Sequence, residues 1–118
     1  MATKYRVNGS GVDKARRMID SRQYETQARW SDAQPSADEE NAKIERDGYG
    51  GYGEWHLAID TEASENTKDR YGFSFGDFRR VSRNALSSAK QRAAQNGHDE
   101  IEKIAGELPD RLDEAASG

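Results

Sequence analysis

The chain has 118 residues, of which 34% are charged and 33% hydrophobic, and its formal net charge at pH 7 is −4. This length predicts a single domain spanning residues 1–118, with an ordered core at about 10–113 and flexible ends. The acidic balance argues against a protein that coats nucleic acid through its overall charge. The chain has no cysteine, which excludes disulfides, thiolate catalysis and cysteine-ligated metal sites, and fits a reducing cytoplasm.

No stretch of the sequence approaches the roughly 18 apolar residues that a membrane-spanning helix needs. The first residues, MATKYRV, lack the apolar core of a signal peptide. We therefore expect a soluble cytoplasmic protein with no membrane partner.

The beginning of the chain predicts an extended segment at 4–8 and then a helix over 11–23. Apolar residues recur there at the spacing of one helix face: Val12, Ala15 and Ile19. Ser10 is expected to cap this helix, in a capping box with Asp13.

A connector is predicted at 24–35. Its Trp30 is expected to pack on the core, because an aromatic side chain buries a large area, and exposure to a partner is the alternative. A second helix is predicted over 36–47, with Ser36 as its N-cap and Glu39 completing a capping box.

The glycine-rich stretch GYGGYG at 48–53 is expected to end that helix and to form a flexible turn. Its letters also match G-x-G-x-x-G, the fingerprint of a dinucleotide-binding loop. That fingerprint requires a strand before it and a helix after it, whereas here a helix precedes and a strand follows. The stretch therefore predicts no nucleotide site, and we expect no cofactor.

Apolar residues alternate with other residues in two central segments: Trp55, Leu57 and Ile59, then Tyr71, Phe73 and Phe75. A period of two is typical of a half-buried strand. We expect an antiparallel hairpin with strands near 54–59 and 70–75, covered by helices because an isolated hairpin is only marginally stable. The predicted fold is α+β and helix-dominated, with about four helices packed on a two-stranded antiparallel aromatic hairpin.

Two helices are predicted in the last third of the chain. The first spans 78–95, with Asp77 as its N-cap and a stop at 96–97. The second begins near Asp99 and carries the clearest apolar stripe of the sequence. Pro109 is expected to kink or interrupt this last helix.

These two helices carry opposite charges: residues 78–95 hold five basic and no acidic residues, and residues 99–114 hold seven acidic and two basic residues. One interpretation is an antiparallel pair with complementary charges. The other is a basic stripe that faces solvent and contacts phosphates, built from Arg79, Arg80, Arg83 and Lys90. If exposed, an aromatic residue would add base stacking, the candidates being Tyr49, Tyr52 and Trp30.

His56 is the candidate for catalysis, because it is the one histidine in a predicted strand. As a general base it would need an orienting carboxylate, for which Glu54 and Asp60 are the nearby candidates, and Asp77 is the second catalytic candidate. Lys68 and Arg70 are candidates for binding an anion near the N-terminus of the helix that Asp77 begins. Alternatively, Asp77 is only a helix cap. The two histidines lack the spacing of zinc ligands, so no metal site is predicted.

Three segments read WHLA, TKDRY and GDFRRVSR. With them, roughly residues 35–112 resemble a group of small bacterial proteins of unassigned function whose motifs are WHLG, TK-x-RY and GDF-x-x-VHR. The matching residues are Trp55, His56, Leu57, Thr67, Lys68, Arg70, Tyr71, Gly76, Asp77, Phe78, Val81 and Arg83. The chain departs from the motifs at Ala58, where they have glycine, and at Ser82, where they have histidine. The resemblance implies no activity, and a family site that used the second histidine would be disabled here.

The sequence favours a small, non-enzymatic binding or adaptor protein. Its contact surface is expected to be the helix 78–95 and the edge of the hairpin. A protein partner is the first expectation, including a second copy in a homodimer paired through that edge, and nucleic acid is the second. The alternative is a small enzyme that acts on an anionic small molecule through four residues: His56, Lys68, Arg70 and Asp77.

Overall fold

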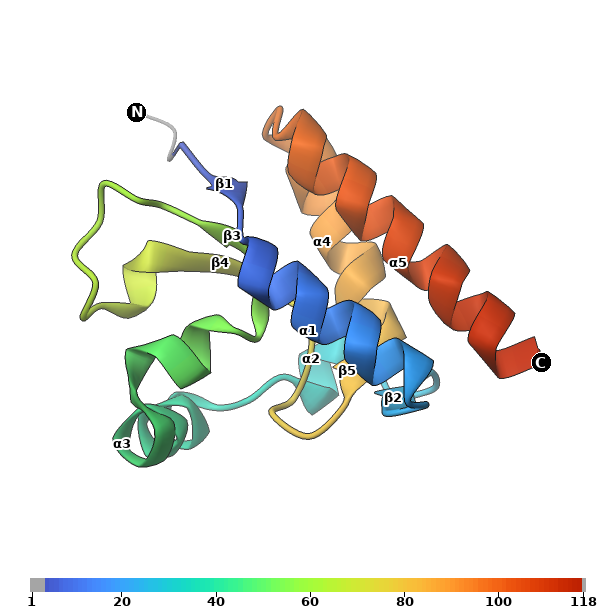
Figure 1. The fold of residues 1–118 in the computed structure, drawn as a ribbon, viewed down its shortest axis with the longest axis horizontal. Coiled ribbons are helices and arrows are strands. Elements are labelled where there is room, and N and C mark those ends of the chain that lie inside the picture. The colour runs from blue at the N-terminus through green and yellow to red at the C-terminus, as the bar shows by residue number, and fades with distance from the viewer. Residues whose placement is uncertain (1–3, 118) are drawn as a thin grey trace.

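Helices dominate the structure, a computed structural model that describes residues 4–117 (Figure 1). The helices are α1 (Gly9–Asp20), α2 (Trp30–Ala33), α3 (Ala37–Gly53), α4 (Arg83–Gln95) and α5 (Asp99–Ser117). In Figure 1, α1, α4 and α5 lie together on one side, and α3 lies on the opposite side. Within residues 4–117, none of these helices is long and apolar enough to cross a membrane.

The strands form two small sheets. The first is antiparallel, in the order β1 (Arg6–Val7), β3 (His56–Ile59), β4 (Tyr71–Ser74), and the second is a parallel pair of β2 (Tyr24–Glu25) and β5 (Val81–Ser82). The helix-dominated α+β class is therefore confirmed. The two predicted segments do pair antiparallel, as β3 and β4. The sheet has three strands instead of the predicted two, because the extended segment near the N-terminus adds β1 to the other side of β3.

α1 begins earlier than predicted, because Asn8 and not Ser10 is its N-cap, and the predicted capping box at Ser10 is wrong. The amide Nδ2 of Asn8 donates to the carbonyl oxygens of Gly53 (3.0 Å) and His56 (3.1 Å). Asn8 thus fastens the start of α1 to the start of β3. The two elements lie so close that a side chain at Gly11 would overlap the carbonyl group of His56. The predicted apolar face of α1 is buried: Val12, Ala15 and Ile19.

The predicted start of α3 is confirmed, and its end lies further along the chain. Ser36 Oγ accepts from the backbone N–H of Glu39, and Glu39 Oε1 accepts from the backbone N–H of Ser36, each at 3.2 Å. Gly48 interrupts the helix with a φ of 76°, a conformation that glycine adopts without steric cost. Beyond it the chain returns to helix instead of forming the predicted flexible turn, and Tyr52 is buried.

α4 starts later than predicted. Residues 76–80 form a loop in which Asp77 Oδ1 accepts from the backbone N–H groups of Arg79 (3.0 Å) and Arg80 (2.8 Å). An N-cap residue makes the same hydrogen bonds. Here, however, the residues after the loop form β5, which pairs with β2, and Ser82 is the N-cap of α4. The prediction that Asp77 caps the helix is therefore wrong, because strand pairing fixes where α4 begins.

α5 runs through Pro109 without a break and ends at Ser117, so the predicted interruption is wrong. A proline inside a helix removes one backbone hydrogen bond and crowds the preceding turn. Here Leu108, Pro109 and Leu112 are all buried. Because burial of two leucines contributes several kcal/mol, roughly 1.5–3 for each, it offsets much of that cost.

One cluster of buried side chains joins the helices to the antiparallel sheet. Trp55 stacks on Phe75 in this cluster, with 5.6 Å between the ring centroids. The largest fully buried members are Phe75, Ile19, Leu57, Leu86, Ile101, Leu108, Leu112 and Val81. Trp30 lies outside the cluster and is half-buried. The predicted packing of Trp30 on the core is therefore wrong.

Candidate functional site

The four residues of the predicted basic stripe do not lie on one helix. Arg79 and Arg80 belong to the loop before α4, and Arg83 and Lys90 are on α4 itself. Arg83 forms a two-point ion pair with Asp113 of α5, from Nε to Oδ1 and from Nη2 to Oδ2, both at 2.8 Å. The opposite charges of the two helices predicted such a contact. The prediction that the four cations form one stripe on a helix is wrong, while binding of a partner by the individual cations stays a prediction.

His56 lies in the interior, with 4% of its surface exposed. The centroid of its ring is 4.6 Å from that of Tyr52 and 5.8 Å from that of Tyr71. Its Nδ1 is 3.1 Å from the carbonyl oxygen of Tyr52, so Nδ1 carries the proton and donates it. Burial lowers the pKa of His56 to about 4. In the described part of the chain no hydrogen bond links His56 to Asp77, and a catalytic role for these two residues stays a prediction.

Lys68 and Arg70 are engaged in contacts within the protein. Both belong to the 3₁₀ turn η1 (Lys68–Arg70), which precedes β4. Lys68 Nζ lies 3.3 Å from Glu40 Oε1 of α3, and Arg70 Nη1 donates to the carbonyl oxygen of Ala63 at 2.9 Å. No helix begins at the predicted position beside them, so the predicted anion site at a helix N-terminus is not formed. Across residues 4–117, no three His, Asp or Glu side chains gather closely enough to hold a metal ion.

The hairpin edge offers little regular backbone for pairing with a partner. β3 is the central strand of its sheet, which leaves the short strands β1 and β4 at the edges. Within β4, Phe73 has a φ of 61°, in the left-handed region that residues other than glycine rarely adopt. The guanidinium of Arg92 lies 5.1 Å from the centroid of the Phe73 ring, so α4 reaches over this strand. A homodimer through the hairpin edge stays a prediction.

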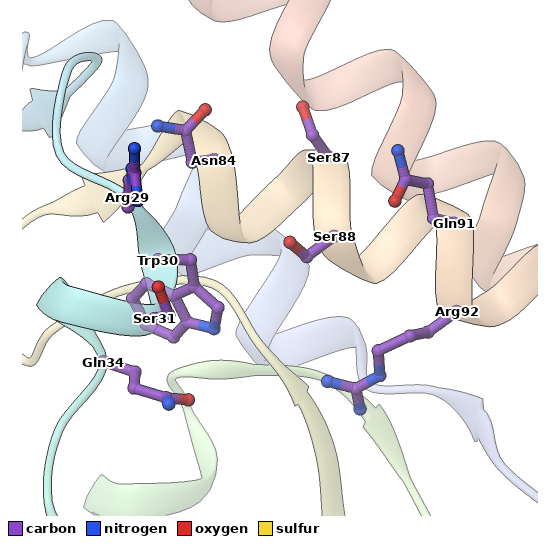
Figure 2. A pocket seen from close by; sticks show the side chains of 9 residues that line it. All are labelled: Arg29, Trp30, Ser31, Gln34, Asn84, Ser87, Ser88, Gln91 and Arg92. Atoms are coloured by element: carbon purple, nitrogen blue, oxygen red, sulfur yellow. The ribbon is translucent and has the colours of Figure 1, made fainter.

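A cleft of about 540 Å³ opens between α2 and α4 (Figure 2). Figure 2 shows Trp30 on the α2 side, a row of polar side chains along α4, and Arg29 and Arg92 at opposite ends of the set. Trp30 is half-buried, and both arginines are exposed, so solvent reaches the indole ring and both guanidinium groups. The lining residues are Arg29, Trp30, Ser31, Gln34, Asn84, Ser87, Ser88, Gln91 and Arg92.

The cleft exists because α4 has two contrasting faces. One face is buried in the core and consists largely of small residues: Ala85, Leu86, Ala89 and Ala93. The other face carries the polar residues of the cleft at i, i+3, i+4, i+7 and i+8, starting from Asn84. The amide Nδ2 of Asn84 donates to the carbonyl oxygen of Ala28 at 2.6 Å, which fastens the segment before α2 onto α4.

Sequence reasoning missed most of this site. The sequence pattern offers Trp30 for stacking, but it does not single out Arg29, and Arg92 enters only as one of the five basic residues of the segment 78–95. A signal was nevertheless present, because polar residues at helical spacing mark a solvated face as clearly as apolar residues mark a buried one. The polar residues of α4 that carry this signal are Asn84, Ser87, Ser88, Gln91 and Arg92.

No carboxylate lines this cleft. Four other clefts in the described residues each include at least one Asp or Glu. Arg29 and Arg92 therefore give the cleft between α2 and α4 a local positive charge, in a chain whose net charge is −4. Such a field attracts anions within roughly one Debye length, about 8–10 Å near physiological ionic strength.

A scan against protein-family models, a search of curated proteins and a search of solved structures each gave no match. The resemblance to small bacterial proteins with WHLG-type motifs therefore stays a prediction. Several residues of those motifs have structural roles in this chain. Trp55 is in the core, Lys68 pairs with Glu40, and Asp77 shapes the loop before α4.

Proposed function

We propose that the protein is a non-catalytic binding protein and that it holds an anionic partner in the cleft between α2 and α4. The observation that carries this proposal is the accessible Trp30 in a cleft with Arg29 and Arg92 at its ends and no carboxylate in its lining. Tryptophan and arginine are the residues most enriched among those that dominate binding energy at interfaces. Their combination in one cleft favours a binding surface.

The polar groups in the cleft suit an anion with hydrogen-bonding atoms. Each guanidinium presents five N–H donors in a planar fork that matches carboxylate or phosphate oxygens. The hydroxyl groups of Ser87 and Ser88 and the amide of Gln91 add donors that carry no charge. The charges of the two arginines therefore attract an anionic partner from a distance, and the uncharged donors form directional hydrogen bonds once it is in contact.

The enzyme alternative has less support from this geometry. A general base must reach the proton that it removes, directly or through one water. His56 is buried beneath Tyr52, and Asp77 accepts backbone hydrogen bonds within its own loop. Lys68 is paired with Glu40. Arg70 donates to the carbonyl oxygen of Ala63, so each of the four residues is engaged in a contact within the protein.

A titration with fluorescein-labelled inorganic polyphosphate, followed by fluorescence anisotropy at about 50 and about 200 mM salt, tests this function. We expect binding at the lower salt and weaker binding at the higher. Arg29→Ala should reduce the affinity. Arg17→Ala is the matched control, because Arg17 is exposed on α1 and does not line the cleft, yet its replacement changes the net charge equally. Equal losses in the two variants, or no binding at the lower salt, would contradict the proposal.

A further inference from the structure

We propose, on the basis of the function above, that the partner is single-stranded nucleic acid and that one of its bases stacks on Trp30. The first argument is the position of this side chain. The chain has two tryptophans: Trp55 has 3% of its surface exposed, whereas Trp30 is half-buried. Helix α2 contains no buried residue. This short helix places Trp30 in the lining of the cleft, next to Arg29, which is its N-cap residue.

The second argument is the type of polar group that lines the cleft together with Trp30. Asn and Gln side chains carry both donors and acceptors, as the edges of nucleic-acid bases do. A carboxylate or sulfate partner only accepts hydrogen bonds, and arginine or lysine alone would serve it. The cleft instead combines three amides with three hydroxyl groups: Gln34, Asn84, Gln91, Ser31, Ser87 and Ser88. This mixture suits the edge of a base, which both donates and accepts hydrogen bonds.

The third argument is the placement of the charges. Arg29 and Arg92 lie at opposite ends of the labelled side chains in Figure 2, with Trp30 on the α2 side. A base stacked on Trp30 is joined to the chain through phosphates on both sides, so phosphates can reach an arginine at each end. The guanidinium of Arg92 is held over the ring of Phe73, which limits its mobility before a ligand arrives.

The strand must be single, because the faces of paired bases are hidden inside a duplex. Proteins that bind single strands combine a cationic groove with aromatic side chains, and each stacked base contributes measurably to affinity. The polar face of α4 from Asn84 to Arg92 extends about 12 Å at 1.5 Å per residue. This length suits a short segment of extended strand.

The test compares four fluorescein-labelled probes with the full chain: an oligothymidylate, an abasic oligomer with the same number of phosphates, a duplex of the same length, and polyglutamate. We expect the oligothymidylate to bind more tightly than each of the others. Trp30→Ala should weaken its binding by about 5- to 150-fold, the effect of losing one stacked base, and should leave the abasic oligomer unaffected. Trp30→Phe should restore part of the affinity, because phenylalanine keeps an aromatic face.

Tryptophan fluorescence gives a readout that needs no variant. A stacked base should quench the emission of Trp30, and the buried Trp55 provides emission that stacking in the cleft leaves unchanged. Equal affinity for the oligothymidylate and the abasic oligomer, or for the duplex, would overturn the inference and leave the proposed function intact. Binding of polyglutamate alone would also overturn the inference and leave the proposed function intact. Failure of all four probes and of polyphosphate would overturn both.

Discussion

Acid should destabilise this protein through His56, and the effect can be worked out from its burial. The surroundings of the ring lower its pKa from 6.5 to about 4, chiefly because burial disfavours the charged imidazolium, while the carbonyl of Tyr52 partly opposes the shift. In the unfolded chain the same side chain takes up a proton near its ordinary pKa. Between these two values the unfolded state therefore binds more protons than the folded state, and stability falls as the pH falls.

The penalty is absent above pH 6.5 and complete once the pH is below the folded-state pKa of about 4. A shift of this size corresponds to roughly 3 kcal/mol at 1.36 kcal/mol for each pH unit. Since domains of this size are stable by about 5–15 kcal/mol, His56 alone removes a substantial share of the free energy of unfolding in mild acid.

Urea unfolding at about pH 7 and about pH 4.5, followed by tryptophan fluorescence, measures this loss. His56→Gln removes the titrating ring, so its free energy of unfolding should fall by about 2–3 kcal/mol less between the two pH values than that of the wild type. His98→Gln retains His56 and should therefore keep the part of the loss that His56 causes. Equal losses in the wild type and His56→Gln would mean that folded His56 titrates like an exposed histidine, which would refute the reasoning.

Three further substitutions test particular contacts. Asn8→Ala leaves two buried carbonyl groups without their donor, so it should cost about 1–3 kcal/mol in urea unfolding, and Asn8→Asp should not rescue it because a carboxylate cannot donate. Gly11→Ala forces a methyl group against the carbonyl of His56 and should cost about 3 kcal/mol, visible as a lower Tm. Arg83→Ala breaks the pair with Asp113 and should leave the affinity for oligothymidylate unchanged, since Arg83 does not line this cleft. A large loss of affinity would instead indicate that the strand contacts the basic residues of the predicted stripe.

The sequence predicted those elements whose signals are local. The capping box of Ser36 and Glu39 depends on residues three apart, and the strand at His56–Ile59 follows from alternation within a few positions. Asp77 shows where local signals fail. Its hydrogen bonds to the next amides fit both a helix cap and a loop, and the choice depends on the pairing of β5 with β2. That pairing joins residues far apart in the sequence, so no local pattern reveals it.

The candidate site was harder to predict for the same reason. The hydrogen bond from Asn84 to Ala28 joins positions separated by 56 residues and links the segment before α2 to α4, so no local pattern reveals the cleft. The basic residues of the segment 78–95 were visible, but their direction was not, because the late start of α4 moves Arg79 and Arg80 onto a loop. The predicted basic stripe therefore groups two loop residues with two helix residues.

The negative net charge and the cationic cleft act in opposite directions on a polyanion, which makes the salt dependence of binding informative. The net charge of −4 repels a nucleic acid at long range, and salt screens that repulsion together with the attraction at the cleft. Two phosphate contacts, by Arg29 and Arg92, predict a slope of log affinity against log salt of about −1.4 at most for a single strand. Four contacts by the cations of the predicted stripe would give about −2.8. A slope near the second value would show that more cations than Arg29 and Arg92 contact the strand, and a slope no steeper than the first supports the cleft.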